Sequence, residues 1–385
     1  MDFGVDDDLE ALRREVQAFV REHFTDDVRA RVAASGDYHD AEFHAALAQR
    51  GWVGAHWSPD QGGRGWDRGR TDVIYEELAS AGAPTEGWAI TQIIGEAIRR
   101  VGSSEQQERL LAPACRGELV FALGYTEPGS GSDLASVRTR AERHGDDWVI
   151  NGQKMFTTLG NIADYVFLLA RTDPQAPKHA GLTIFLVPTS ATGFSVAPIR
   201  TLGGQRTNVT YYSDVRVSDA ERVGDIGQGW EIVNVALAFE RGGEFAAQLR
   251  RLVNAGVAWG LDNAGTADPA FDSRLGHAIA DAEVARLLGA QASWSRSSAK
   301  AGAVEGTTAK VHATEALIRH SRALLDATGA GGLATRGPSP AAQELQHLYR
   351  EAQISTIYGG TSEVLMTVIA QQRLGLPRGR RRPTT

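Results

Sequence analysis

The sequence has few of the residues that would mark it at once as one class of protein. Its 385 residues include a single cysteine, Cys115, which excludes a disulfide within the chain and a metal site built from several thiolates, and which fits a reducing cytoplasm. No apolar stretch approaches the ~18 uncharged residues that a membrane-spanning helix needs. The opening residues, MDFGVDDDLEALRREV, lack the basic and apolar regions of a secretory signal. We therefore expect a cytoplasmic globular protein with no membrane span.

Positive charge is also scarce. The 40 lysines and arginines are outnumbered by 47 aspartates and glutamates, and a net charge of −7 argues against a surface for nucleic acid. The arginines at 378 and 380–382 are interpreted as part of a solvated tail. The chain also lacks a G-x-G-x-x-G motif between a strand and a helix and the H-E-x-x-H spacing of a zinc site. Neither a dinucleotide-binding fold nor a metal site is expected.

Hydrophobic spacing divides the chain into three parts. Apolar residues recur at helical spacing in the first part, and short runs rich in β-branched and aromatic residues follow from Val120 onward. Helical patterns return at Gly229 and continue to Leu374. Such segregation is typical of an α+β fold and not of a βαβ winding. We predict an N-terminal helical domain over 1–120, a middle β domain over 121–226 and a C-terminal helical domain over 227–385.

The stretch YTEPGSGSD, residues 125–133, concentrates small and hydroxyl-bearing residues. Gly129 and Gly131 free the backbone to turn its N–H groups in one direction, and Thr126 and Ser132 add hydroxyl donors. Such a cradle suits an anion such as a cofactor phosphate. On composition alone, a simple turn after a strand is the more common explanation.

Two further stretches change this interpretation. NGQKMFTTLGNIADYVFLLART occupies 151–172, and IYGGTSEV occupies 357–364. In this order and at these separations, the three motifs closely resemble those of the acyl-CoA dehydrogenase family of flavoenzymes. The resemblance covers nearly the whole chain and extends to GWVGAHWSPDQGGRGWD and GQGWEIVNVALAFERGG. It implies an α+β subunit with an N-terminal helical domain, a middle β domain and a C-terminal four-helix bundle, with FAD between the β domain and the bundle.

The resemblance also implies a set of cofactor-binding residues: Tyr125, Thr126, Ser132, Phe156, Thr158 and Thr361. The first three would lie along the flavin and its pyrophosphate. Phe156 would pack against the flavin, and the hydroxyl of Thr158 would meet N5, the atom that accepts hydride. Thr361 would lie near the cofactor at the end of the bundle.

Oxidation of an acyl thioester to its 2,3-enoyl product needs a base for the weakly acidic α-proton, and a carboxylate of raised pKa in a dry pocket suits that task. Many family members carry this glutamate just before the Gly-Thr of the last motif, where this chain has Gly359. A second branch of the family carries it on a bundle helix, just before an arginine. The corresponding residues here are Glu240 and Arg241.

The residues themselves support this choice. Trp230, Val233 and Leu237 precede Glu240 at helical spacing, so Glu240 continues an apolar stripe, and burial there would raise its pKa. An ordinary structural glutamate is the alternative. We expect Glu240 to be the catalytic base. Arg241 and Gly359 are assigned to the substrate side, where the resemblance implies that the backbone N–H of Gly359 holds the thioester carbonyl.

Two departures from the family pattern concern the subunits around FAD. The region 258–279 lacks the Arg-x-x-Phe-Gly-like stretch that reaches the FAD of a neighbouring subunit in many relatives. Asp326 replaces a glutamine with a similar role, and its carboxylate would repel a pyrophosphate. The chain is therefore expected to form either a homo-oligomer that holds FAD differently or a heteromer with a related subunit.

The leading hypothesis is FAD-dependent α,β-dehydrogenation of an acyl-CoA or acyl-carrier thioester, with an electron-transfer flavoprotein as the electron acceptor. One alternative is a flavin monooxygenase of the same fold, against which Glu240 and Thr158 both argue. The other is a flavin-poor partner subunit of a heteromeric dehydrogenase, which Asp326 favours and Glu240 disfavours.

Overall fold

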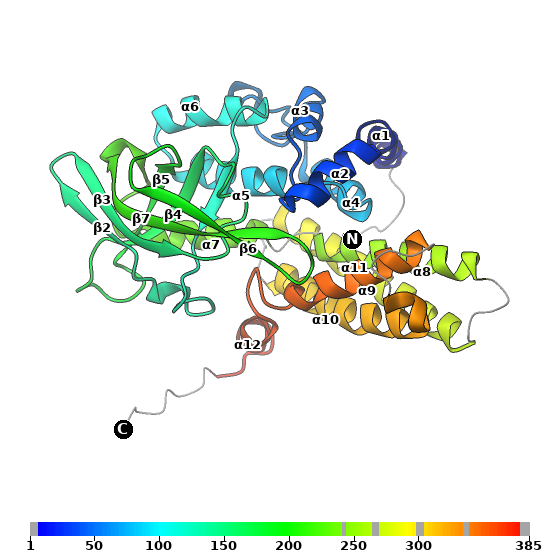
Figure 1. The fold of residues 1–385 in the computed structure, drawn as a ribbon. Coiled ribbons are helices and arrows are strands. Elements are labelled where there is room, and N and C mark those ends of the chain that lie inside the picture. Colours follow the sequence, from blue (N-terminus) through cyan, green and yellow to red (C-terminus); the bar gives the residue numbers. More distant parts are fainter. Residues whose placement is uncertain (1–6, 241–243, 264–268, 298–303, 334–338, 378–385) are drawn as a thin grey trace. The chain divides into compact units, whose positions relative to one another are not determined.

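The computed structural model describes residues 7–240, 244–263, 269–297, 304–333 and 339–377 (Figure 1). They belong to two compact units, Met1–Glu240 and Arg241–Thr385. The first unit holds the N-terminal helices, the sheet and one later helix, and the second holds helices alone.

The first unit begins with helices whose ends follow ordinary capping chemistry. They are α1 (Asp7–His23), α2 (Asp26–Ser35), α3 (Ala41–Gln49), the short 3-10 helix η1 (Pro59–Gln61), α4 (Arg68–Ser80), α5 (Glu86–Val101) and α6 (Ser104–Cys115). Helix α1 buries Leu12, Val16 and Phe19 on one face. Ser103 and Gln106 form a capping box at the start of α6, because each side chain accepts a hydrogen bond from the other residue's N–H.

An eight-stranded sheet follows, in the order β6-β7-β3-β2-β4-β5-β8, with β1 paired to β4. The strands are β1 (Phe121–Gly124), β2 (Arg140–His144), β3 (Asp147–Lys154), β4 (Tyr165–Arg171), β5 (Leu182–Pro188), β6 (Phe194–Arg200), β7 (Arg206–Ser218) and β8 (Arg222–Val223). The interior of β4 and most of β5 are buried on both faces, which explains their unbroken apolar runs.

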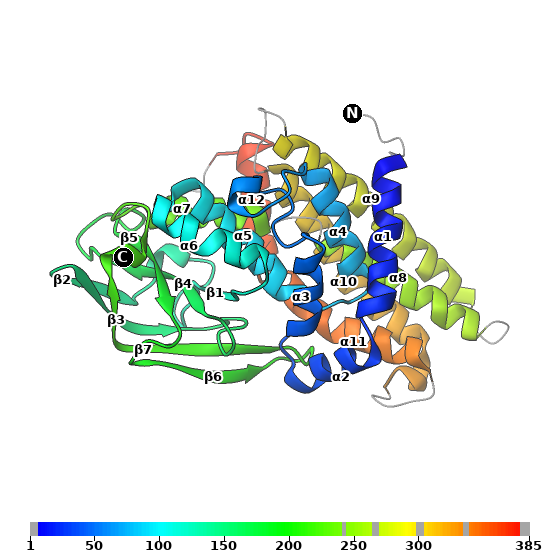
Figure 2. The same cartoon turned by 90° about the horizontal axis from the view of Figure 1, so that it is seen from above.

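Two helices far apart in the sequence cover part of this sheet. Helix α5 packs against β1, and α7 (Gly229–Glu240) packs against β5 and against α5 (Figure 2). The shared core contains Trp57, Ile94, Phe167, Ile184 and Val233, all fully buried. The sheet is therefore held rigidly where its β1 end leads into the YTEPGSGSD stretch.

The second unit is a helical bundle. Helices α8 (Glu244–Asp262), α9 (Pro269–Ser297), α10 (Val304–Ala327) and α11 (Pro340–Ser355) surround one core that includes Leu249, Phe271, Leu317 and Leu345. The short 3-10 helix η4 (Gly329–Leu333) follows α10, and α12 (Ser362–Gln372) packs against α10. The loop between α11 and α12 carries the IYGGTSEV motif.

The helical, β, helical order confirms the predicted α+β class. Strands β2 and β6 were not predicted from hydrophobicity. β2 is short and mostly exposed, and β6 lies at the edge of the sheet, where its residues are half-buried or exposed and Pro198 is tolerated. The predicted domain bounds, 1–120, 121–226 and 227–385, stay a prediction.

Candidate active site

The YTEPGSGSD stretch is a tight turn with a buried anchor. Glu127 and Ser130 exchange two backbone hydrogen bonds of 3.1 Å, which close the turn. The carboxylate of Glu127 points back into the protein, where it accepts hydrogen bonds from the N–H groups of Arg138 (2.6 Å) and Thr139 (2.8 Å). The buried glutamate thus fixes the turn to the segment that leads into β2.

Lys154, at the end of β3, completes this anchor. Its ammonium donates to Oε1 of Glu127 at 2.8 Å and to the carbonyl oxygen of Tyr125 at 3.1 Å, and its side chain is fully buried. Burial lowers the pKa of Lys154 to about 8, against the opposing effect of Glu127. Burial alone would raise the pKa of Glu127, but Lys154 and the N–H donors outweigh it, so the carboxyl pKa is lowered and the group is ionised.

The outer side of the turn has the features of a ligand site. Ser130 is 3% exposed, and its buried hydroxyl has no hydrogen-bond partner among the described residues. A methyl group added at Gly129 or Gly131 would meet no heavy atom within 4 Å. Buried hydroxyls are normally hydrogen-bonded, so the Ser130 hydroxyl is an exception. The open space at Gly129 and Gly131, beside the exposed Ser132, fits an anionic ligand such as a cofactor phosphate.

The loop after β3 presents an aromatic ring at a cost in backbone strain. Phe156 has a φ of +58° and its residue is 54% exposed. A left-handed conformation is unfavourable for a bulky side chain, and an exposed phenylalanine gains little from folding. The strain and exposure together indicate a ring placed for a ligand.

Backbone and side-chain hydrogen bonds tie this loop to the turn and to β7. The N–H of Met155 donates to the carbonyl oxygen of Thr126 at 2.8 Å, so the two segments lie side by side. The buried Asn208 donates to the carbonyl oxygen of Thr157 at 3.1 Å. The hydroxyl of Thr158 lies 3.2 Å from that of Thr207.

The structure therefore brings Tyr125, Thr126, Phe156 and Thr158 into one small region of the first unit. Tyr125 is buried, and its ring packs edge-on against Phe167. Ser132 is exposed two residues beyond Ser130.

The remaining predicted site residues belong to other parts of the chain. Helix α7 ends at Glu240, whose side chain lies outside the described part of the structure, as does Arg241. Gly359 and Thr361 lie in the loop before α12. Gly359 has a φ of +63°, and the hydroxyl of Thr361 caps α12 by accepting from the N–H of Val364 at 3.3 Å.

Lys310 was not singled out from the sequence. It lies on α10, is 1% exposed, and donates to the carbonyl oxygens of Tyr358 and Gly360 on either side of Gly359. Lys154 was missed in the same way. In each case the signal is a lysine in an otherwise apolar or motif-bearing stretch, and only the fold reveals its partner.

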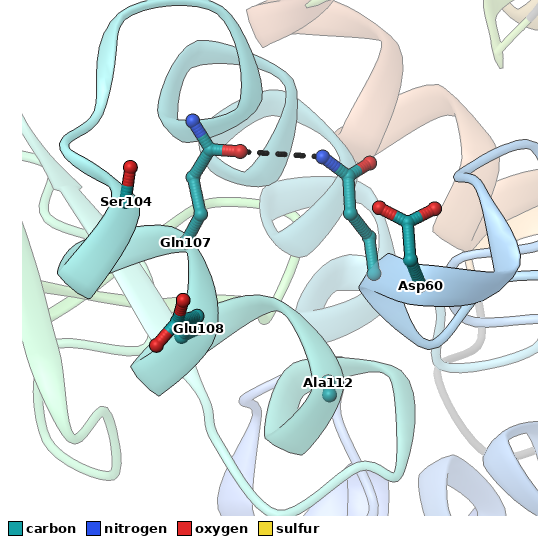
Figure 3. A pocket seen from close by; sticks show the side chains of 6 residues that line it. Asp60, Ser104, Gln107, Glu108 and Ala112 are labelled. Carbon is teal, nitrogen blue, oxygen red and sulfur yellow. Dashed lines mark hydrogen bonds between the residues drawn. The ribbon is translucent and has the colours of Figure 1, made fainter.

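A separate hollow of about 250 Å³ lies between η1 and α6 (Figure 3). It is lined by Asp60, Gln61, Ser104, Gln107, Glu108 and Ala112. Gln61 donates to Gln107 across it at 3.3 Å. Its two carboxylates would repel the phosphates of a CoA thioester, and none of the predicted site residues lines it.

No group of three or more histidine, cysteine, aspartate or glutamate side chains is arranged to hold a metal among the residues that the structure describes. Within the same residues, no helix combines the length and apolar character needed to cross a bilayer.

Comparison with known proteins identifies the family. Three family models match in succession: acyl-CoA dehydrogenase N-terminal domain over 6–118, middle domain over 122–216 and C-terminal domain over 227–374. The chain belongs to the acyl-CoA dehydrogenase family. Members of this family are flavoproteins, and the chain is accordingly an acyl-CoA dehydrogenase, an oxidoreductase.

Individual relatives cover the chain from end to end. Acyl-CoA dehydrogenase FadE26 of Mycobacterium tuberculosis is 36% identical over 395 residues, with 97% of this chain and 98% of the relative covered. Acyl-CoA dehydrogenase FadE29 of the same organism is 32% identical over 392 residues, with 96% and 98% covered.

Solved structures agree with this acyl-CoA dehydrogenase (ACAD) assignment. A chain of the Tcur3481-Tcur3483 steroid ACAD superimposes with a TM-score of 0.92 and 37% identity, covering 98% of this chain and all of that one. A chain of the ChsE4-ChsE5 complex from Mycobacterium tuberculosis gives a TM-score of 0.89 and 34% identity, with 98% and 100% covered.

Proposed function

We propose that this acyl-CoA dehydrogenase binds FAD and converts an acyl-CoA to its 2,3-enoyl thioester. The observation that carries the proposal is the region formed by the 125–132 turn and Phe156. It combines open space beside two glycines, the exposed Ser132, and an aromatic ring exposed on strained backbone. These features fit a phosphate-bearing cofactor with a flat ring system.

Within this region, Thr126 and Ser132 would bind the pyrophosphate, and Tyr125 and Thr158 would lie along the flavin. The carbonyl oxygens of Tyr125 and Thr126 are already bonded to Lys154 and Met155, so the backbone of the turn is set before the cofactor arrives. Bound FAD would accept the hydride that leaves the β-carbon of the substrate. Thr361 is assigned to FAD on the bundle side.

Glu240 is the proposed base for the α-proton. It ends α7, whose preceding turns bury Ile232, Val233 and Ala236. The sequence pattern predicts that Glu240 continues this apolar face, where a desolvated carboxylate would be a stronger base. Gly359 supplies no carboxylate, so the second branch of the family is the better match.

Gly359 and Arg241 are proposed on the substrate side. As the α-proton leaves, negative charge develops on the thioester oxygen, and the backbone N–H of Gly359 would stabilise it. Without a side chain, residue 359 would also leave room near the reacting carbons for a bulky acyl group.

A CoA thioester of a bulky, ring-bearing acid is the proposed substrate. Support comes from the name of one similar structure, which is that of a steroid ACAD. A related second subunit is the proposed partner, because two similar structures are named as pairs and because Asp326, exposed at the end of α10, would repel a pyrophosphate. An electron-transfer flavoprotein is the proposed electron acceptor, and a reducing cytoplasm remains the expected compartment.

The second candidate function is that of a flavin-poor subunit that completes the site of another chain. Asp326 and the missing Arg-x-x-Phe-Gly-like stretch favour it, whereas Phe156 and Glu240 favour a chain that holds FAD itself. A monooxygenase of the same fold has no observation in its favour.

The visible spectrum of the purified chain separates these functions. The chain is measured alone and with a co-expressed related subunit, before and after anaerobic addition of short, branched and steroid-like acyl-CoA thioesters. FAD near equimolar amounts that bleaches with a ring-bearing thioester supports the proposal. A folded but colourless chain, with FAD present only in the pair and retained when Ser132 and Phe156 are substituted, would support the second function.

A further inference from the structure

A buried lysine donates hydrogen bonds to the loop that carries Gly359. Lys310 lies in the middle of the buried face of α10, among apolar and small residues, and is 1% exposed. Its ammonium lies 5.3 Å from the ring centre of Phe245 and 5.7 Å from that of Tyr358. Placing a charge in such surroundings costs several kcal/mol unless the charge is well satisfied, and an apolar side chain would fill the position at less cost.

The hydrogen bonds of Lys310 explain why a charged side chain occupies this buried position. The ammonium donates to the carbonyl oxygen of Gly360 at 2.5 Å and to that of Tyr358. Gly359 has a φ of +63° and Gly360 a φ of +96°. Glycine adopts this left-handed conformation readily, whereas it is unfavourable for other residues. The carbonyl groups of Tyr358 and Gly360, on either side of Gly359, thus converge on one cation.

Because the peptide bond is planar, these contacts fix the direction in which the neighbouring N–H groups point. The carbonyl oxygen of Tyr358 and the N–H of Gly359 belong to the same trans peptide group and point in opposite directions. The same holds for the carbonyl of Gly360 and the N–H of Thr361. Because Lys310 holds both oxygens, both N–H groups point away from α10. No described residue accepts a hydrogen bond from the N–H of Gly359.

The charge of Lys310 also makes the N–H of Gly359 a stronger hydrogen-bond donor. A positive charge at a carbonyl oxygen polarises the peptide group and makes its N–H a better hydrogen-bond donor. Preorganised donors of this kind stabilise the developing oxyanion of an acyl transfer or enolisation without reorganisation.

We propose that Lys310 is a positioning residue for dehydrogenation: through the carbonyls of Tyr358 and Gly360 it orients the N–H of Gly359 that stabilises the substrate enolate, and through the carbonyl of Tyr358 it polarises that N–H. The inference rests on the proposed function, since it requires Gly359 to face the thioester. It adds a residue that touches neither substrate nor cofactor.

The test measures enolisation without turnover. The probe is the 3-oxo form of whichever acyl-CoA thioester bleaches the wild-type holoenzyme, because its α-proton is acidic enough to leave without a redox step. Absorbance of the bound probe against pH gives its enolisation pKa. Lys310→Met removes charge and donor, and Lys310→Gln keeps a donor without the charge.

Thr314→Val is the matched control, because Thr314 is buried on the next turn of α10 and its hydroxyl bonds only within the helix, to the carbonyl oxygen of Lys310 at 2.9 Å. Both Lys310 variants are expected to raise the enolisation pKa by about one unit or more and to lower kcat about tenfold or more, with KM little changed. Thr314→Val should match the wild type in both.

An enolisation pKa equal to that of the wild type in Lys310 variants that retain FAD would overturn the inference. So would loss of folding or FAD in both Lys310 variants while Thr314→Val is normal, because Lys310 would then be a structural residue. Failure of the proposed function shows separately, in a wild-type holoenzyme that no thioester bleaches and that does not enolise any 3-oxoacyl-CoA.

Discussion

The ammonium nitrogen of Lys154 lies 2.8 Å from Oε1 of Glu127, and both side chains are buried. This pair connects the end of β3 to the turn at 125–130, the two segments that frame the proposed cofactor region. It is the anchor on which the shape of the turn depends.

Breaking this pair should cost more than removing it. Glu127→Gln or Lys154→Met alone leaves a buried charge without its partner and should lower the free energy of unfolding by about 3 kcal/mol. The double variant, which removes both charges, should lose less than either single variant. Urea unfolding of the four proteins, with FAD content measured in parallel, gives the coupling. Lys178→Met is the control, because Lys178, between β4 and β5, and Asp133 form a more exposed pair whose loss should cost less than about 1 kcal/mol. Equal costs for the two lysines would contradict the account.

Replacing Phe156 with glycine should weaken FAD binding without lowering the stability of the cofactor-free protein. Glycine adopts a φ of +58° without strain, so Phe156→Gly should leave the cofactor-free protein as stable or up to about 1 kcal/mol more stable. The same change should weaken FAD binding about tenfold, since the exposed ring is the group that would pack against the flavin. Phe156→Trp keeps an aromatic ring and should retain FAD. Thermal unfolding of the cofactor-free protein and fluorescence titration with FAD measure the two effects. A glycine variant that is less stable yet binds FAD normally would make Phe156 a structural residue.

His44 should make the first unit sensitive to acid. Burial lowers the pKa of His44 to about 4, and its two ring nitrogens have no hydrogen-bond partner among the described residues. The unfolded chain takes up the proton near the ordinary value of 6.5, whereas the folded chain resists it. Stability from this group is therefore complete above about pH 6.5 and is lost as the pH falls toward 4, by about 3 kcal/mol in all.

The slope of unfolding free energy against pH tests this. His44→Leu should flatten the slope between pH 6.5 and 4. His277→Leu, which changes an exposed histidine of α9, should leave it unchanged. A wild-type slope in the His44 variant would show that other groups carry the acid sensitivity.

Cys115 should be inert in the folded protein. Its thiol is buried against Trp57 and the 51–63 segment, and burial raises its pKa to about 11. Because the thiolate is the reactive form, an aromatic disulfide reagent at pH 8 should modify Cys115 only as fast as the first unit opens. One equivalent should react at once in strong denaturant. Rapid reaction of the native protein would show that the segment over Cys115 is open.

The sequence predicted those parts of the fold that depend on local pattern. The amphipathic spacing of Leu12, Val16 and Phe19 is enough to identify α1, and the apolar run of β4 is enough to identify a buried strand. Strand β2 escaped because Arg140–His144 is mostly charged, and it is held in place by pairing with β3 and not by burial. Edge strands and short strands owe their existence to a neighbour that local hydrophobicity does not reveal.

The candidate site also has some features that the sequence reveals and others that only the fold reveals. The glycines and hydroxyls of 125–133 are visible in the sequence because they form one stretch, and the family resemblance supplied their role. The partners of Lys154 and Lys310 lie 27 and about 50 residues away, so the burial of both ammonium groups followed only from the fold. The strain at Phe156 is equally invisible in the sequence, because phenylalanine seldom adopts a positive φ.

The central claim is that Glu240 removes the α-proton. The direct measurement is the rate at which the flavin absorbance of the holoenzyme bleaches after anaerobic mixing with the acyl-CoA thioester that reduces the wild type, compared with Glu240→Gln. The account predicts that the variant keeps its FAD and binds the thioester but bleaches about a thousandfold more slowly. Bleaching of the variant at a rate near that of the wild type would contradict it.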